Sequence, residues 1–337
     1  MKGQFFAIGK PQWDEACKLG LNSAVALLVL GCGTGHDNAT TSWSAKAINT
    51  YTGMSWVRAN NALALLDRNP RIVTSVAPSG KLRRRKLVIP EDSARWLWLP
   101  NALVMGARDE VPPIARLRQA QNLEHLQVFI ELYGVHDLTG DGGLPRSILW
   151  KPYDVCERIC QRGPFTVWGF RDSKGTRYGD RTGPFARFQN RKGKVAAFWE
   201  CVSAFERFGF LERVDYLAEG DSPDAELLHA LAGDEYAQEA YDALLSFAIS
   251  LPAIYAQALD IYDYVIPVLR HIEKPAVVGV YRLVYRPHTG LTAAWYARHR
   301  EACRNYAERY RALAIGDLHE ASRASSVISR SIKVVQG

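Results

Sequence analysis

The stretch TTSWSAKAINTYTGMSWVRANNALALLDRNPRIV, residues 40–73, decides the fold of the N-terminal part of the chain. Residues 40–50 open with Thr and Ser, which are favoured helix caps, and then place apolar side chains at helical spacing. A glycine-containing break follows at 51–54, and Ser55 is placed to cap a second helix at 56–68. That helix carries one apolar stripe, made of Ala59, Ala62, Leu63 and Leu66. Two short helices about such a turn predict a helix-turn-helix.

The flanking segments extend this motif in both directions. Residues 14–30 are rich in apolar side chains and predict a helix that ends at the glycine cluster 31–35. After the second helix, the β-rich run 71–76 and the run 81–89 are separated by Ala-Pro-Ser-Gly at 77–80, which predicts a hairpin. A helix, a helix-turn-helix and a hairpin in this order predict a winged helix.

The net charge of +7 is concentrated in two short segments. Residues 81–86 contain five basic side chains and no acidic one, and residues 171–194 contain eight basic and two acidic side chains. Such blocks are typical of a surface that binds a polyanion, because a merely solvated surface intersperses the two signs. In the hairpin, the candidate phosphate-binding residues are Lys81, Arg83, Arg84, Arg85 and Lys86. In the second segment, the candidates are Arg177, Arg181, Arg187, Arg191, Lys192 and Lys194.

The helix at 56–68 also offers side chains that are suited to reading base edges. Arg and Asn can each make two coplanar hydrogen bonds, Arg to guanine and Asn to adenine. The residues outside the apolar stripe that we expect in the major groove are Ser55, Trp56, Arg58, Asn60 and Asn61.

Residues 14–90 resemble bacterial winged-helix DNA-binding domains, notably those of plasmid and phage replication initiators with tandem winged helices and of related regulators. The stretch 40–73 carries the resemblance. It implies sequence-specific binding of double-stranded DNA by a replication initiator or a transcription regulator of a mobile element. The expected partner is duplex DNA, and a homodimer is compatible with this role.

A second, looser copy of the motif is predicted further along the chain. Residues 114–136 predict a long helix, and residues 195–208 predict another that leads through Gly209 into a strand-like run at 210–217. Between these helices, the basic segment 171–194 is interpreted as an extended hairpin.

The predicted fold class is therefore mainly α with small β hairpins (α+β), with two tandem winged helices and a helical C-terminal region. Residues 224–314 are interpreted as mostly helical, interrupted by a β run at 276–285. The expected domains are a winged helix at 1–95, a second winged-helix-like domain with a basic hairpin at 96–222, and a mostly helical region at 223–337.

One motif favours a different function. Leu-Gly-Cys-Gly-Thr-Gly at 30–35 is similar to the glycine loop of S-adenosylmethionine methyltransferases, which requires a strand before it and a ribose-binding acid on the next strand. Val29 stands where that family carries an acid, and residues 51–56 contain none. We therefore interpret the motif as a turn between helices and expect no cofactor. A winged helix that binds another protein is the third alternative.

No enzyme or metal-site signature is evident. The chain lacks a nucleophile with a partner base, and its six cysteines include no CxxC pair, so we expect no catalytic and no metal-binding residues. The cysteine pattern does not predict a disulfide framework. The longest apolar run, 24–30, is too short to cross a bilayer, so we expect no membrane partner and a cytoplasmic location.

Overall fold

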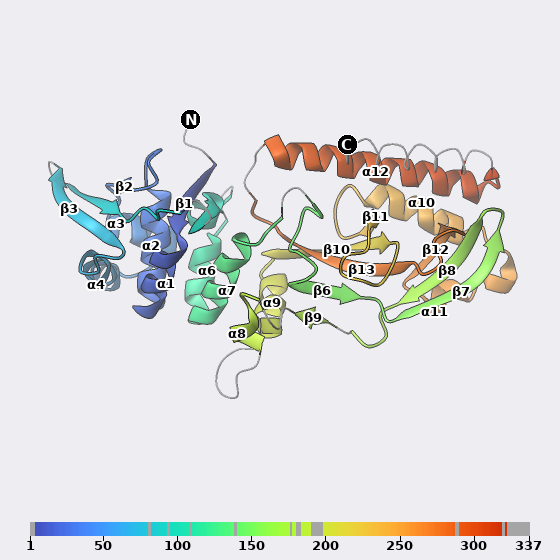
Figure 1. Ribbon diagram of the computed structural model, residues 1–337, viewed down its shortest axis with the longest axis horizontal. Coiled ribbons are helices and arrows are strands. Elements are labelled where there is room, and N and C mark those ends of the chain that lie inside the picture. Colours follow the sequence, from blue (N-terminus) through green and yellow to red (C-terminus); the bar gives the residue numbers. More distant parts are fainter. Residues whose placement is uncertain are drawn as a thin grey trace. The chain divides into compact units, whose positions relative to one another are not determined.

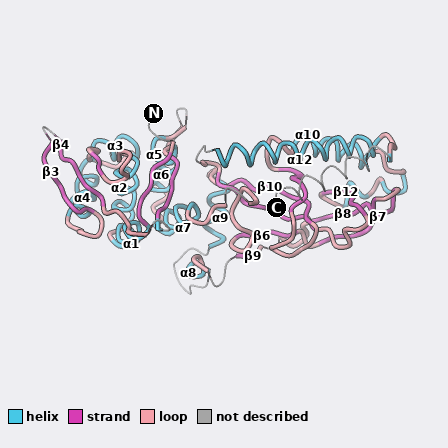
Figure 2. Tube along the Cα trace, turned by 45° about the horizontal axis from the view of Figure 1, so that its top comes forward, coloured by secondary structure: helices cyan, strands magenta, loops and turns pink. Residues whose placement is uncertain are grey.

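The computed structural model describes residues 4–79, 82–92, 95–107, 110–137, 140–175, 177–179, 183–189, 198–286, 290–318 and 321. The protein is mixed α/β, with 43% helix and 24% strand. The prediction of a mainly α chain with small hairpins is therefore wrong. Strands β6 to β13 all lie beyond residue 148, and most of them were not expected, although β10 and β13 fall in the expected β runs at 210–217 and 276–285 (Figures 1 and 2).

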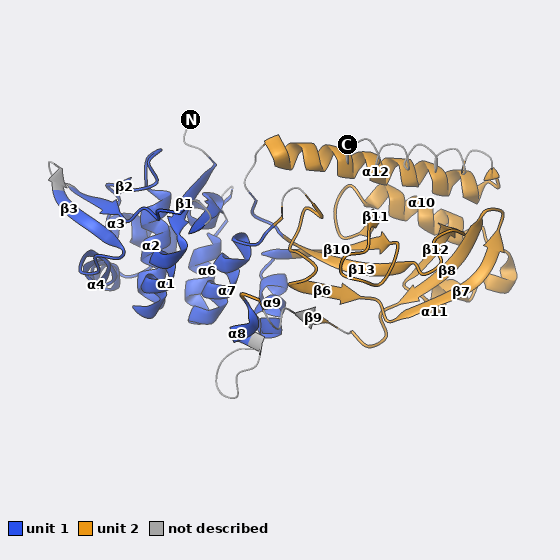
Figure 3. Cartoon of the chain, viewed as in Figure 1, with its two compact units in different colours: residues 1–136, 185–211, 283–288 blue, residues 137–184, 212–282, 289–337 orange. Residues whose placement is uncertain are grey.

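The chain divides into two compact units, each built from three separate segments (Figure 3). Unit 1 comprises residues 1–136, 185–211 and 283–288, and unit 2 comprises residues 137–184, 212–282 and 289–337. These units differ from the three consecutive segments that the sequence suggests. An expected boundary at 95/96 would separate β1 (Phe5–Gly9) from its antiparallel partner β5 (Trp96–Pro100).

After β1, unit 1 has two helices where a single one was expected. They are α1 (Lys10–Lys18) and α2 (Leu21–Cys32), and Gly20 between them has φ of 100°, a conformation that side-chain-bearing residues rarely adopt. Residues 24–32 of α2 are all buried. Because it is apolar all round, α2 forms the centre of this part of the unit, where it packs against α1, α3 and α4.

The helix-turn-helix and the hairpin have the elements expected from residues 40–89. Helices α3 (Ala45–Thr52) and α4 (Trp56–Asp67) are joined by a short turn, and β3 (Val73–Ser79) and β4 (Leu82–Leu87) form an antiparallel pair. The short strand β2 (Thr40–Thr41) adds to β4, which gives the sheet order β2-β4-β3. From α2 to β4, the order of elements is that of one winged helix.

The rest of unit 1 is helical. The helix expected at 114–136 is divided into α6 (Pro113–Gln119) and α7 (Leu123–Tyr133). Asn122 causes the break, because its side chain caps α7 by accepting hydrogen bonds from the backbone amides of Glu124 and His125 at 2.9 and 3.2 Å. The remaining helices are α5 (Ala102–Met105), α8 (Ala186–Gln189) and α9 (Phe198–Arg207).

The second winged helix does not form. Helix α9 does lead into a strand, β10 (Leu211–Ala218), but β10 lies in a five-stranded sheet of order β11-β10-β13-β6-β9 instead of a wing. The other strands of this sheet are β6 (Leu149–Pro152), β9 (Tyr178–Gly179), β11 (Leu227–Ala232) and β13 (Ala276–Leu283). Since β9 pairs with β6, the described part of the segment 171–194 is not a hairpin.

Unit 2 also contains a three-stranded sheet, β12-β8-β7, and the helices that pack on the strands. Its strands are β7 (Val155–Arg162), β8 (Phe165–Arg171) and β12 (Tyr264–Leu269). Its helices are α10 (Gln238–Ile249), the 3-10 helix η2 (Ala253–Tyr255), α11 (Ala258–Ile261) and α12 (Gly290–Ala314). Side chains of α10 and α12 enter one core with those of β8, β10, β12 and β13. The region 224–314 thus contains β11 and β12 in addition to its helices and the expected β run, β13.

No single helix in the described part of the chain is long and apolar enough to cross a membrane. One pair of segments, Gln238–Ile249 and Ala253–Ile261, passes that test jointly, but the pair is bent by 116° at the break between them.

Candidate nucleic-acid interface

Helix α4 has an exposed face that carries both polar and apolar side chains, and it buries a stripe on the other side. The stripe is formed by the four residues that the sequence indicates, Ala59, Ala62, Leu63 and Leu66. Ser55, Arg58, Asn60 and Asn61 are exposed, as is Trp56, whose exposed fraction is 56%. Val57 is 67% exposed and was not among the expected contact residues. Its exposure follows from the same helical period that buries the stripe, so the signal was present in the sequence.

Ser55 and Asn60 have local roles that the sequence did not specify. Ser55 is the N-cap residue of α4, but its side chain makes no capping hydrogen bond. Asn60 donates from Nδ2 to the carbonyl oxygen of Trp56 at 3.0 Å. The side-chain amide of Asn60 is therefore partly used within its own helix.

The turn between α3 and α4 is held in one conformation by several hydrogen bonds. Gly53 has φ of 64°, and its amide donates to the carbonyl oxygen of Asn49 at 2.9 Å. The side chain of Asn49 donates to the carbonyl oxygen of Met54 at 2.8 Å, and Met54 is fully buried. Arg118 of α6 donates to the carbonyl oxygen of Thr52 at 3.0 Å. These bonds fix the entry of α4, which a binding helix requires.

Arg118 was missed as a neighbour of this face because it is distant in sequence. Its side chain is buried, and burial together with the positive charge of Arg58 lowers the pKa of Arg118. Arg58 makes no hydrogen bond to any residue that the structure describes, and it is exposed at the start of α4. Two guanidinium groups thus create a positive potential at this end of the helix.

The β3–β4 hairpin presents three of the five basic residues to solvent. Arg83, Arg84 and Lys86 are exposed, while Lys81 lies outside the described residues. Strand β4 is the central strand of its sheet, and Pro78 lies on the edge strand β3 opposite Arg83. An edge strand tolerates proline, since its outer amide needs no partner. The turn predicted at 77–80 begins too early in the sequence, because β3 continues to Ser79.

Arg85 does not belong to the exposed basic surface, which corrects the sequence interpretation. Its side chain is only 5% exposed and pairs with Asp67, the last residue of α4, through bonds of 2.7 Å (Nε to Oδ1) and 3.0 Å (Nη2 to Oδ2). Its Nη1 also donates to the carbonyl oxygen of Trp43 at 3.4 Å. Arg85 therefore ties the hairpin to the end of α4 and to the segment before α3. A bidentate pair of this kind fixes orientation as well as distance.

The two described arginines among the candidates of the second basic segment belong to different units. Arg177 belongs to unit 2 and is half-buried, whereas Arg187 belongs to unit 1 and pairs with Glu131, whose side chain is 4% exposed. Burial raises the pKa of Glu131, and the charges of Lys10 and Arg187 oppose that rise. Arg187 thus compensates a buried carboxylate. Arg181, Arg191, Lys192 and Lys194 lie outside the described residues.

The glycine motif at 30–35 is the end of helix α2 and the turn after it. Residues 21–32 are helical, so the strand that must precede a dinucleotide-type loop is not there. A Cβ on Gly31 would lie 2.6 Å from Ile8, and a Cβ on Gly33 would lie 2.3 Å from the ring of Trp43. Close packing accounts for both glycines.

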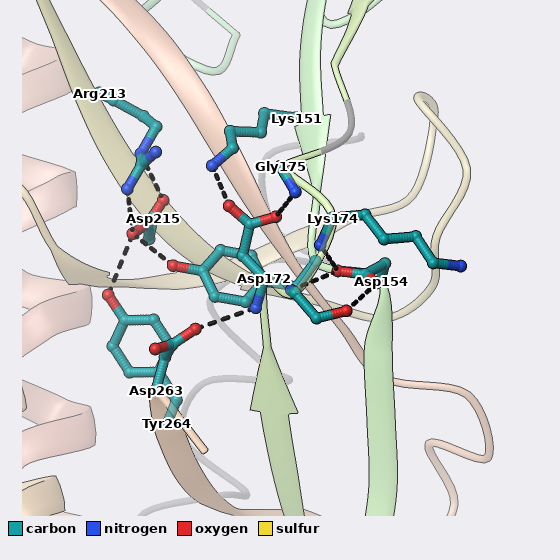
Figure 4. A network of polar contacts seen from close by, with 11 residues as sticks. Lys151, Asp154, Asp172, Lys174, Gly175, Arg213, Asp215, Asp263 and Tyr264 are labelled. Carbon is teal, nitrogen blue, oxygen red and sulfur yellow. Dashed lines mark hydrogen bonds and ion pairs between the residues drawn. The ribbon is translucent and has the colours of Figure 1, made fainter. Parts of the chain in front are cut away.

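Unit 2 contains a network of carboxylates beside tyrosines and basic residues, drawn in Figure 4. Asp215 is 5% exposed and accepts hydrogen bonds from the hydroxyls of Tyr153 and Tyr264 at 3.0 and 3.1 Å. Burial raises the pKa of Asp215, and the charge of Arg213 opposes that rise. Lys151 pairs with Asp172, whose amide donates to Asp263 at 2.9 Å. These bonds connect β6, β10 and the end of β8, so the network joins the two sheets of the unit.

A second buried cluster in unit 2 lies beside a pocket of about 380 Å³. Asp234 accepts hydrogen bonds from Arg282 Nη1 and His299 Nε2, both at 2.6 Å. Burial alone would raise the pKa of Asp234, but the hydrogen bond and charge of His299 and the charge of Arg282 hold it well below its usual range. Trp295 stacks on His299 with a centroid distance of 4.8 Å. The cluster thus balances its buried charges among its own members.

Metal-ligand side chains do not converge in the part of the chain described. No group of three or more His, Cys, Asp or Glu residues there could hold a metal ion. Cys156 and Cys160 lie on strand β7 as exposed and half-buried thiols.

Comparison with protein-family models, with curated proteins and with solved structures found no match to this chain.

Proposed function

We propose that unit 1 binds double-stranded DNA in a sequence-specific manner, with α4 in the major groove and the β3–β4 hairpin on the flanking backbone. The observation that carries the proposal is the joint presentation of the exposed face of α4 and the exposed Arg83, Arg84 and Lys86 within one winged helix. In that geometry the side chains of the second helix reach base edges and the wing contacts phosphates.

The rigidity of this surface supports the proposal. The Arg85–Asp67 pair links β4 to the end of α4, and the hydrogen bonds at Gly53 and Asn49 fix its start. Sequence readout needs such rigidity, because hydrogen bonds to base edges tolerate little displacement. A flexible basic loop would supply only non-specific affinity.

The resemblance of residues 14–90 to winged-helix domains suggests the biological role. We infer a replication initiator or a transcription regulator of a mobile element, which acts on DNA in the cytoplasm, and a homodimer would read two half-sites. The alternative partner of a winged helix is another protein, and the experiment below distinguishes the two.

The test is selection of bound sequences from a random duplex pool by the full chain, followed by titration of the selected duplex at several salt concentrations. We expect one enriched sequence, protection of a single site from nuclease, and affinity that falls steeply with salt. The variant W56A/R58A should lose the preference for the selected duplex over random duplex. The control R207A removes an exposed arginine from α9, which packs against α7 and α8, and should keep that preference.

Salt-insensitive binding, or no enrichment with weak binding to every duplex, would contradict the proposal. The first result would indicate adventitious contact, and the second would favour a protein partner for α4.

A further inference from the structure

We infer that the centre of the α4 surface reads A·T base pairs, with Asn61 binding adenine and Val57 contacting the thymine methyl group. This inference rests on the proposed function and specifies its target. The observations behind it are the order of side chains on the outer face of α4 and the different hydrogen bonding of its two asparagines.

The outer face is defined by helix geometry. Residues of an α-helix advance by about 100° each, so positions four, seven and eleven residues apart share a face. Starting from Val57, these positions are Asn61, Ala64 and Arg68, and all four residues are exposed. They lie opposite the buried stripe of Ala59, Ala62, Leu63 and Leu66. This row therefore points most directly away from the protein.

The two asparagines are not equivalent. Asn60 donates an Nδ2 hydrogen to the carbonyl oxygen of Trp56. Around the helix axis, Asn60 lies about 100° from Asn61. Asn61 makes no side-chain hydrogen bond to any residue described in the structure, and it lies in the middle of the row. Its free amide offers a donor and an acceptor in one plane, which matches N7 and the N6 amino group of adenine.

Val57 supports the same base pair. It is 67% exposed, and its two methyl groups are fixed by a single favoured rotamer in a helix. An apolar side chain in the major groove discriminates bases only through the C5 methyl of thymine. Ala64, one turn beyond Asn61, is small enough to let the helix approach.

The centre of the row has no side chain suited to G·C pairs. Recognition of guanine uses Arg or Lys, and recognition of cytosine uses Asp or Glu. The row has no acidic residue, and its first basic residue is Arg68, just beyond the last residue of α4. Arg58 lies about 100° from Val57, at the flank of the face. We therefore expect any guanine contact at the edge of the site.

The experiment uses the duplex selected by the full chain and two modified versions of it. In one, each thymine in turn is replaced by uracil, which lacks the C5 methyl group. In the other, each adenine in turn is replaced by 7-deazaadenine, which lacks N7. For the wild-type protein, we expect one uracil position to weaken binding about fourfold, since one buried methyl contributes ~0.8 kcal/mol. One deazaadenine position should weaken it roughly 5- to 150-fold.

The variants assign each effect to a side chain. V57A should abolish the uracil effect and keep the deazaadenine effect, whereas N61A should do the reverse. R207A is the control, because it removes an exposed side chain from a helix outside this surface, α9, and should keep both effects. All three place alanine in an exposed helical position, where it favours the helix, so the fold should be retained. Far-UV circular dichroism checks this.

The outcomes separate this inference from the proposed function. Sequence-selective, salt-dependent binding in which V57A and N61A leave both base effects unchanged would overturn the A·T assignment and leave duplex binding intact. Binding that shows no sequence preference at all would contradict the proposed function itself. A G·C base pair at the centre of the selected site would also overturn the assignment.

Discussion

Replacement of neighbouring arginines on β4 should separate DNA binding from stability. The change is R83A/R84A in one protein and R85A in another. The three arginines are consecutive and chemically identical, yet Arg83 and Arg84 are exposed while the side chain of Arg85 is 5% exposed and paired with Asp67. We expect the first protein to lose DNA affinity with its stability unchanged, and the second to lose stability.

The size of each effect follows from these environments. If Arg83 and Arg84 each contact one phosphate, their loss makes the plot of log affinity against log salt less steep by about 1.8, and each contact accounts for about eightfold in affinity between 1 M and 0.1 M salt. Removing Arg85 leaves the Asp67 carboxylate without its partner. Loss of one partner from a buried ion pair typically lowers the free energy of unfolding by ~3 kcal/mol. We expect R85A to lower the free energy of unfolding by no more than this amount, because the Asp67 side chain is 18% exposed.

Two measurements check this prediction. Fluorescence anisotropy of a labelled duplex across a salt series gives the binding slope, and urea unfolding followed by tryptophan fluorescence gives the free energy of unfolding. The control R207A removes an exposed arginine from α9 and should change neither. The reasoning is refuted if R83A/R84A retains the wild-type salt slope, or if R85A is as stable as wild type and loses slope instead.

Three further predictions concern the fold. G33A should destabilise the protein by about 1–3 kcal/mol in urea unfolding, because the new Cβ would lie 2.3 Å from the Trp43 ring. N122A should cost about 1 kcal/mol in the same assay, because it removes the cap of α7, while N60A should cost less. Burial lowers the pKa of His229 to about 3 from 6.5, so the folded state binds fewer protons than the unfolded state between these values. The contribution of His229 to the free energy of unfolding is therefore fully present above pH 6.5 and is lost as the pH falls. The free energy of unfolding should decrease by about 2 kcal/mol between pH 7 and 5. H229Q should flatten the plot of unfolding free energy against pH, whereas H271Q, at an exposed histidine, should not. Equal slopes of these plots in the two variants would contradict the assignment of the pH dependence to His229.

The elements that sequence predicted well are those whose signals are local. Helix α4 has its glycine turn, its preceding Ser55 and its apolar stripe all within residues 53–66, and β3 and β4 pair across a short hairpin. The pairing of β8 with β12 joins residues 165–171 to residues 264–269, and no local pattern specifies that partner. Short apolar runs such as 264–269 fit a buried helix as well as a strand. The error in fold class follows from this ambiguity.

Two helix breaks were missed although their residues were visible. Gly20 and Asn122 each divide a run that is apolar at helical spacing on both sides. A glycine inside a helical pattern is often tolerated, so it predicts a break only when the chain must adopt positive φ, as Gly20 does at 100°. Asn122 ends a helix only because the capping bonds to Glu124 and His125 form in the folded chain.

The basic run on the hairpin shows why a count of charges overestimates a binding surface. Sequence treats residues 81–86 as one block, but the Asp67 that neutralises Arg85 lies 18 residues away, at the end of α4. The pair therefore subtracts a cation from the wing and adds a fixed connection between the wing and the helix. Because phosphate contacts set the register of a protein on DNA and base contacts specify the sequence, such a connection couples the two. Moving the wing on the backbone would also move Asn61 and Val57 relative to the bases. If unit 1 binds duplex DNA as we propose, Arg85 would therefore contribute to specificity without contacting DNA.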